Sequence, residues 1–134
     1  MKTRPTLTLE DARRVAAAAR AEAVKNGWSV VVAIVDDGGW LTYLERADDV
    51  QPASCEISQA KARTAALFRR PSKALEEVVA GGRIAMLSLP HMTPVEGGVP
   101  LICEGTVVGA IGVSGVQSHQ DGQIAQAGAA ALIQ

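Results

Sequence analysis

The segment Thr93–Ser114 constrains the fold of this 134-residue chain more than any other part of the sequence. Two short apolar runs, Val99–Cys103 and Thr106–Val113, are separated by only two residues. The second of these is Gly105, and glycine readily adopts the positive φ that a two-residue hairpin turn requires. The segment therefore predicts two antiparallel strands joined by a tight turn.

Glycines are concentrated in and before this hairpin. Glu96 is followed directly by Gly97 and Gly98, a pattern that indicates a sharp backbone excursion at the end of a strand. Three more glycines recur at three-residue intervals in and after the second strand: Gly109, Gly112 and Gly115. Either a ligand approaches the backbone closely here, or the missing side chains only admit an Ala-rich helix against the sheet. The sequence leaves both interpretations open.

The remaining elements follow from periodicity and capping signals. Thr8 predicts the N-cap of a first helix that closes at Asn26–Gly27. Val30–Val35 is too apolar for a strand with one face exposed to solvent, so it predicts a central strand of the sheet. Trp40–Arg46 is expected to be its hairpin partner. Further helices are expected at Ser54–Arg69, at Lys73–Val79 with Ser72 as its cap, and at about Asp121–Ile133. Ile84–Leu89 fits either a helical turn or a strand. The expected inner face of the helix Ser54–Arg69 consists of Ile57, Ala60, Thr64, Leu67 and Phe68.

Tight hairpins imply an antiparallel sheet, and the helices between them must lie on its faces. The prediction is one α+β domain that spans residues 1–134. Aromatic residues make up only 3% of the chain, so its core must be built from small side chains in close helix–sheet contact. The net charge of −1 offers no basic face for nucleic acid. No run is long enough for a membrane helix, and the charged start does not resemble a signal peptide, so a cytoplasmic location is expected.

Few residues stand out as candidates for chemistry. Lys61 lies close to the apolar face of its helix, where it either extends its ammonium to solvent or pairs with a carboxylate, for which Glu96 is the expected partner. His91, in a Pro-flanked loop, is either an exposed loop residue or a haem ligand or general base. His119 is less specific, and the two histidines lack the spacing of a metal site. Arg63 is expected to be solvated or at a subunit contact.

Several motifs together resemble one known family. They are Val35-Asp-Asp-Gly-Gly39, Ala60-Lys-Ala-Arg-Thr-Ala65, Glu96-Gly-Gly-Val-Pro100, Gly109-Ala-Ile-Gly-Val-Ser-Gly115 and Gln120-Asp121. In this order, from about Leu7 to Leu132, they resemble the GlcG/HbpS-like family of haem-degrading or haem-binding domains. The resemblance implies a profilin-like fold with a five-stranded antiparallel sheet, assembly into homo-oligomers (commonly octamers), and binding of haem or another small molecule.

Three functions remain open at this point. The first is a protein that binds haem, a corrinoid or another flat cofactor at an oligomer interface. Its candidate binding residues are His91, which is also the candidate metal ligand, and Gly97, Gly98 and Ser114. The second is an enzyme for a small organic acid or ring compound, with Lys61 and Glu96 as its catalytic groups. The third is an accessory subunit. The scarcity of aromatic residues counts against haem, which usually lies between such side chains.

Overall fold

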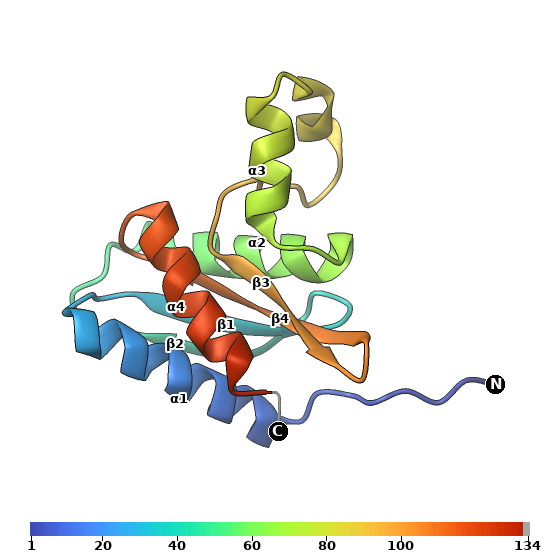
Figure 1. Cartoon of the computed structure of the whole chain (residues 1–134). Coiled ribbons are helices and arrows are strands. Elements are labelled where there is room, and N and C mark those ends of the chain that lie inside the picture. The colour runs from blue at the N-terminus through green and yellow to red at the C-terminus, as the bar shows by residue number, and fades with distance from the viewer. Residues whose placement is uncertain (133–134) are drawn as a thin grey trace.

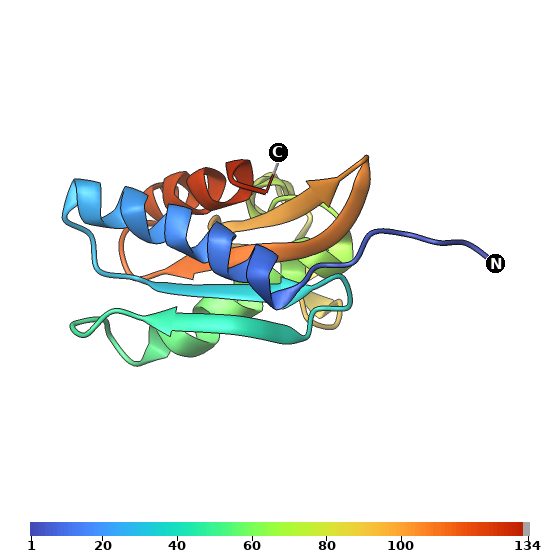
Figure 2. The same ribbon diagram turned by 90° about the horizontal axis from the view of Figure 1, so that it is seen from below.

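The computed structural model describes residues 1–132 and places the sheet at the centre of the molecule. Its elements are α1 (Leu9–Asn26), β1 (Val31–Asp36), β2 (Leu41–Arg46), α2 (Ala53–Phe68), α3 (Ser72–Ala80), the 3₁₀ helix η1 (Ile84–Ser88), β3 (Gly98–Cys103), β4 (Thr106–Ser114) and α4 (Ser118–Ala130). The strands are ordered β2-β1-β4-β3, and every neighbouring pair is antiparallel. Helices α1 and α4 cover one face of this sheet and α2 covers the other (Figures 1 and 2). The predicted single α+β fold is therefore confirmed.

The expected number of five strands is wrong, because the sheet within residues 1–132 has four. The segment that could have supplied a fifth forms η1 instead. Figure 1 shows α3 projecting away from the sheet and carrying η1 with it, so this segment has no strand beside it with which to pair. Its apolar side chains stay in solvent, with Ile84 71% exposed and Leu87 54% exposed.

The local signals at the first helix and at the β3–β4 turn are confirmed. The Thr8 hydroxyl accepts the Asp11 N–H and the Asp11 carboxylate accepts the Thr8 N–H. The Thr8 N–H and the Thr8 hydroxyl both donate to this carboxylate and hold the pKa of Asp11 below its ordinary value. Gly27 ends α1 with a φ of 71°. Glu104 and Gly105 both have positive φ, 52° and 76°, as a type I′ hairpin turn requires.

Two details of the later helices differ from expectation. Pro71 occupies the N-cap position of α3, and the Ser72 hydroxyl bonds to the backbone of Val95 and Gly98 instead of capping the helix. Helix α4 begins at Ser118, earlier than expected, and is described to Ala130. Ile133, the expected end of that helix, lies outside the described residues.

A glycine pair in the sheet sets the position of α2. Gly98 on β3 lies directly opposite Gly112 on β4. A Cβ atom on Gly112 would stand 2.0 Å from the Ser58 carbonyl oxygen, and one on Gly98 would stand 2.2 Å from the Lys61 carbonyl oxygen. Backbone atoms of α2 thus occupy the space above the pair. For these two glycines, the interpretation that they admit a helix is confirmed.

This close contact also explains why the predicted inner face of α2 is wrong at every position except Thr64. The buried residues of α2 are Ser54, Ser58, Lys61, Ala62, Thr64, Ala65 and Ala66. Apart from Lys61 they are small, as the short distance to the sheet demands. Leu67, expected in the core, is 38% exposed, and Ile57 is half-buried. Side-chain size, more than hydrophobicity, has decided which side of this helix faces the sheet.

Candidate functional site

Lys61 is the largest of the fully buried side chains in the described part of the chain. It is 2% exposed, and its Nζ donates to the Val113 carbonyl oxygen at 3.0 Å and to the Asp121 carboxylate at 2.9 Å. Asp121 is also 2% exposed and accepts the Val116 N–H at 3.2 Å. The ion pair expected between Lys61 and Glu96 is therefore wrong, because Asp121, in the first turn of α4, takes the place of Glu96.

Burial and a neighbouring carboxylate act together on Asp121. Burial raises the pKa of the Asp121 carboxyl above its ordinary value, and the charge of Glu96 adds to the increase. The Lys61 ammonium and the Val116 N–H act on this pKa in the opposite direction. Glu96 thus lies close to the pair without forming an ion pair of its own among residues 1–132.

Glu96 faces a cavity that we call the Glu96 cavity. It has a volume of about 480 Å³ and lies between the starts of α3, β3 and α4. Its lining residues include Glu96, Gly97, Gly98 and His119. The Glu96 carboxylate packs against Gly122 of α4, where an added Cβ atom would stand 2.6 Å from Oε2. Lys61 does not line this cavity and packs against Gly97 instead, where an added Cβ atom would stand 2.9 Å from its Nζ.

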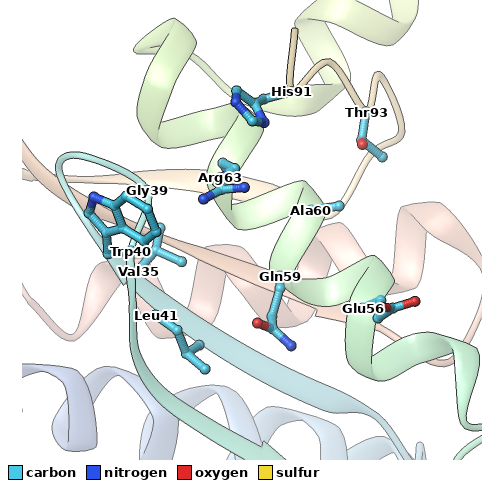
Figure 3. A pocket seen from close by; sticks show the side chains of 10 residues that line it. All are labelled: Val35, Gly39, Trp40, Leu41, Glu56, Gln59, Ala60, Arg63, His91 and Thr93. Carbon is cyan, nitrogen blue, oxygen red and sulfur yellow. The ribbon is translucent and has the colours of Figure 1, made fainter.

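A second cavity, which we call the Trp40 cavity, lies between the β1–β2 turn, the outer side of α2 and the loop after η1 (Figure 3). Its volume is about 530 Å³, within the usual range for small-molecule sites. The lining residues are Val35, Gly39, Trp40, Leu41, Glu56, Gln59, Ala60, Arg63, His91 and Thr93. It shares none of them with the Glu96 cavity.

An arginine stacked on an aromatic ring forms one wall of the Trp40 cavity. The Arg63 guanidinium carbon lies 5.3 Å from the centre of the Trp40 ring. The stem of Arg63 crosses the turn at Gly39, where a Cβ atom would stand 3.0 Å from the Arg63 Cγ. Among residues 1–132 this guanidinium forms no ion pair, so its charge is available to an anionic group in the cavity. The Trp40 side chain is 68% exposed.

The site residues predicted from the sequence are divided between the Trp40 cavity, the Glu96 cavity and the interior of the protein. His91 is exposed and lines the Trp40 cavity, whereas His119 is exposed at the Glu96 cavity. Ser114 is 4% exposed and donates to the Ser54 hydroxyl at 3.0 Å. Ser114 lines neither cavity, and Gly97 and Gly98 lie in the other cavity from His91. No three metal-ligating side chains are grouped together within residues 1–132.

Comparison with known proteins identifies the family to which this chain belongs. The family model described as haem degrading protein HbpS-like matches residues 7–130. The chain belongs to the HbpS-like family. The protein GlcG of Escherichia coli K12 is 50% identical over 114 residues, which are 85% of each chain.

Solved structures of similar proteins share the fold. The crystal structure of a double mutant of Streptomyces reticuli HbpS matches with a TM-score of 0.89 at 34% identity, over 97% of this chain and 89% of that one. The crystal structure of a PduOC–haem complex matches with a TM-score of 0.86 at 30% identity, over 95% of both chains.

Sequence reasoning missed the roles of two residues that line the Trp40 cavity, and it missed Asp121 as the partner of Lys61. Trp40 was assigned only to a strand, and Arg63 only to solvent or a subunit contact. Asp121 belongs to a motif of the family resemblance, and that motif was the only signal that pointed to it. The Arg63–Trp40 stack brings together residues 23 positions apart in the sequence, and no local pattern predicts it.

None of the helices within residues 1–132 combines the length and apolar character that a membrane crossing requires.

Proposed function

We propose that this protein binds haem, or a closely related flat cofactor, in the Trp40 cavity. The observation that carries the proposal is the set of groups that line this one hollow: an exposed imidazole from His91, a guanidinium without an ion-pair partner in the described residues, and the exposed faces of Trp40 and Leu41. A haem complex of a structural neighbour supports it. The chain has few aromatic residues to pack against haem, but the cavity contains Trp40, one of its two tryptophans.

The lining residues fit the chemistry of haem. The His91 imidazole would serve as the axial ligand of the iron, a role that histidine commonly has in haem proteins. Arg63 would pair with a carboxylate on the edge of the macrocycle. Trp40 and Leu41 would shield one of its faces from water. Bound haem would supply one-electron or oxygen chemistry, and the protein would supply position and electrostatics.

The test is a titration of the purified protein with haemin, followed in the Soret region. We expect a sharpened, saturable band in the unsubstituted protein. His91→Ala should abolish that band because the axial ligand is lost, whereas His119→Ala, in the other cavity, should leave it unchanged. Circular dichroism should show both variants folded. A broad, unsaturable spectrum that neither substitution alters would mean adventitious adhesion of haem and would overturn the proposal.

The Glu96 cavity favours a second candidate function, an enzyme for a small organic acid or ring compound. The half-buried Glu96 carboxylate has no hydrogen-bond or ion-pair partner for its own oxygens within residues 1–132, and it faces a cavity that also presents the His119 imidazole. A carboxylate so placed is suited to proton transfer. If the protein has this second function, Glu96 would contact the substrate. The buried Lys61 ammonium would act on the site electrostatically from outside the cavity.

We also expect the protein to assemble into a homo-oligomer larger than a dimer, with an octamer as the arrangement implied by the family resemblance. Several large apolar side chains are exposed in the isolated chain, among them Trp40, Ile84 and Leu87. Contact between identical subunits would cover them. Light scattering at micromolar concentration should give the mass of an oligomer, and a monomer mass would contradict this expectation.

A further inference from the structure

Thr64 ties the loop that carries His91 to helix α2. The Thr64 side chain is fully buried, and its Oγ1 accepts the Thr93 N–H at 3.0 Å. The same oxygen lies 2.9 Å from the His91 carbonyl oxygen and 2.8 Å from the Ala60 carbonyl oxygen, so its single hydrogen is shared between these two acceptors. One hydroxyl therefore holds both ends of the three-residue loop 91–93.

The loop needs this support because His91 has a strained backbone and a free side chain. Its φ is 61°, in the left-handed region that residues other than glycine seldom adopt. The imidazole itself is exposed and forms no hydrogen bond or ion pair with the described residues. The backbone of the loop therefore sets the position of His91 and the direction of its Cα–Cβ bond, and the Thr64 hydroxyl holds that backbone.

We propose that Thr64 is a positioning residue that directs the His91 imidazole into the Trp40 cavity. This inference rests on the proposed function, because it assigns Thr64 a role through the ligand that His91 would bind. Thr64 does not line the cavity, so it acts on the bound group through the loop that carries His91 and Thr93.

Ser72 provides a matched control within the same chain. Its hydroxyl is also fully buried, accepts the Gly98 N–H at 2.8 Å and donates to the Val95 carbonyl oxygen at 2.6 Å. It therefore holds the next bend of the chain in the same manner, but that bend carries Glu96 into the other cavity. Removal of either hydroxyl leaves buried backbone groups unpaired, whereas only the Thr64 hydroxyl holds His91.

The experiment is a haemin titration of Thr64→Val, Thr64→Ser and Ser72→Ala beside His91→Ala, with the melting temperature of each variant. We expect Thr64→Val to weaken haemin binding by about 10–100-fold, the usual effect of losing a group that orients a metal ligand. Its Soret band should be broader and weaker than in the unsubstituted protein, between that protein and His91→Ala, in which the sharpened band is lost. Thr64→Ser keeps the hydroxyl and should restore both affinity and band shape. Ser72→Ala should lower the melting temperature and leave both haemin readouts unchanged.

Three outcomes would overturn the inference. A Thr64→Val protein with unsubstituted affinity and band shape would show that the hydroxyl does not direct His91. An equal loss of affinity in Ser72→Ala would show a general effect of destabilisation. If His91→Ala itself kept the band, both the proposed function and the positioning role of Thr64 would fail. If only Thr64→Val behaved like the unsubstituted protein, the positioning role would fail and the proposed function would remain. Should Thr64→Val not fold, Thr64→Ala removes the same hydroxyl with a smaller side chain and gives the same comparison.

Discussion

Replacement of Lys61 by methionine is expected to lower the free energy of unfolding by about 3–5 kcal/mol, the usual cost of breaking a buried ion pair from one side. Methionine retains most of the length of the lysine side chain but removes its charge. The Asp121 carboxylate would then stay buried, at 2% exposure, without the cation 2.9 Å away that compensates for its lost hydration. The Val113 carbonyl oxygen would lose a donor as well. Urea denaturation at pH 7 measures the difference.

Two comparisons make this prediction specific. Glu96→Gln changes a half-buried carboxylate that has no ion pair among residues 1–132, so we expect a loss below about 1 kcal/mol. The double variant Lys61→Met/Asp121→Leu removes both buried charges, and it should recover much of the stability lost by Lys61→Met alone. A Lys61→Met protein as stable as the unsubstituted one would contradict the buried pair.

The same pair predicts a pH dependence. Burial raises the pKa of Asp121 in the folded state above its unfolded value, so the folded protein binds this proton more readily than the unfolded chain does. The contribution of this carboxyl to stability is therefore largest below its unfolded pKa and falls as the pH rises through the folded pKa. In Lys61→Met, a neutral Asp121 no longer needs a cation, so the deficit in unfolding free energy should shrink as the pH is lowered toward the ordinary pKa of an aspartate.

Replacement of Gly112 by alanine should cost about 3 kcal/mol or more, at or above the upper end of the usual range for overpacking. The new Cβ atom would stand 2.0 Å from the Ser58 carbonyl oxygen and 2.5 Å from the Ala62 backbone nitrogen. Both atoms belong to the α2 backbone, so no side-chain rotation relieves the clash. The helix would have to move away from the sheet, and the small side chains packed beneath it would lose their contacts.

Gly38→Ala is the control for this substitution. The nearest atoms to a Cβ at Gly38 would be those of the Trp40 and Asp36 side chains, at ordinary contact distances of 3.4–3.7 Å, so we expect a change within about 0.5 kcal/mol. Thermal unfolding of the two variants beside the unsubstituted protein measures the contrast. Equal stabilities of Gly112→Ala and Gly38→Ala would mean that α2 does not lie directly on the glycine pair.

Signals carried by neighbouring residues were enough to predict most elements of this fold. The Thr8–Asp11 capping box, the Gly27 cap and the Glu104–Gly105 turn each depend on backbone groups a few residues apart, so the sequence alone determined them. The apolar run at β1 required burial on both faces, and this placed it in the centre of the sheet. The family resemblance, drawn from motifs along almost the whole chain, added an expectation of haem or small-molecule binding that the sequence left open beside its alternatives.

Only the tertiary structure decided which side chains meet. The sequence predicted Glu96 as the partner of Lys61, whereas the packing of α4 against β3 and β4 places Asp121 beside the ammonium instead. The inner face of α2 depended on a glycine pair formed by two different strands, so the periodicity of the helix could not reveal it. The Trp40 cavity likewise joins a turn, a helix and a loop whose lining residues are at least 15 positions apart in the sequence. Contacts of this kind depend on how surfaces fit once the elements have packed, and that information is distributed over the whole chain instead of residing in any one segment.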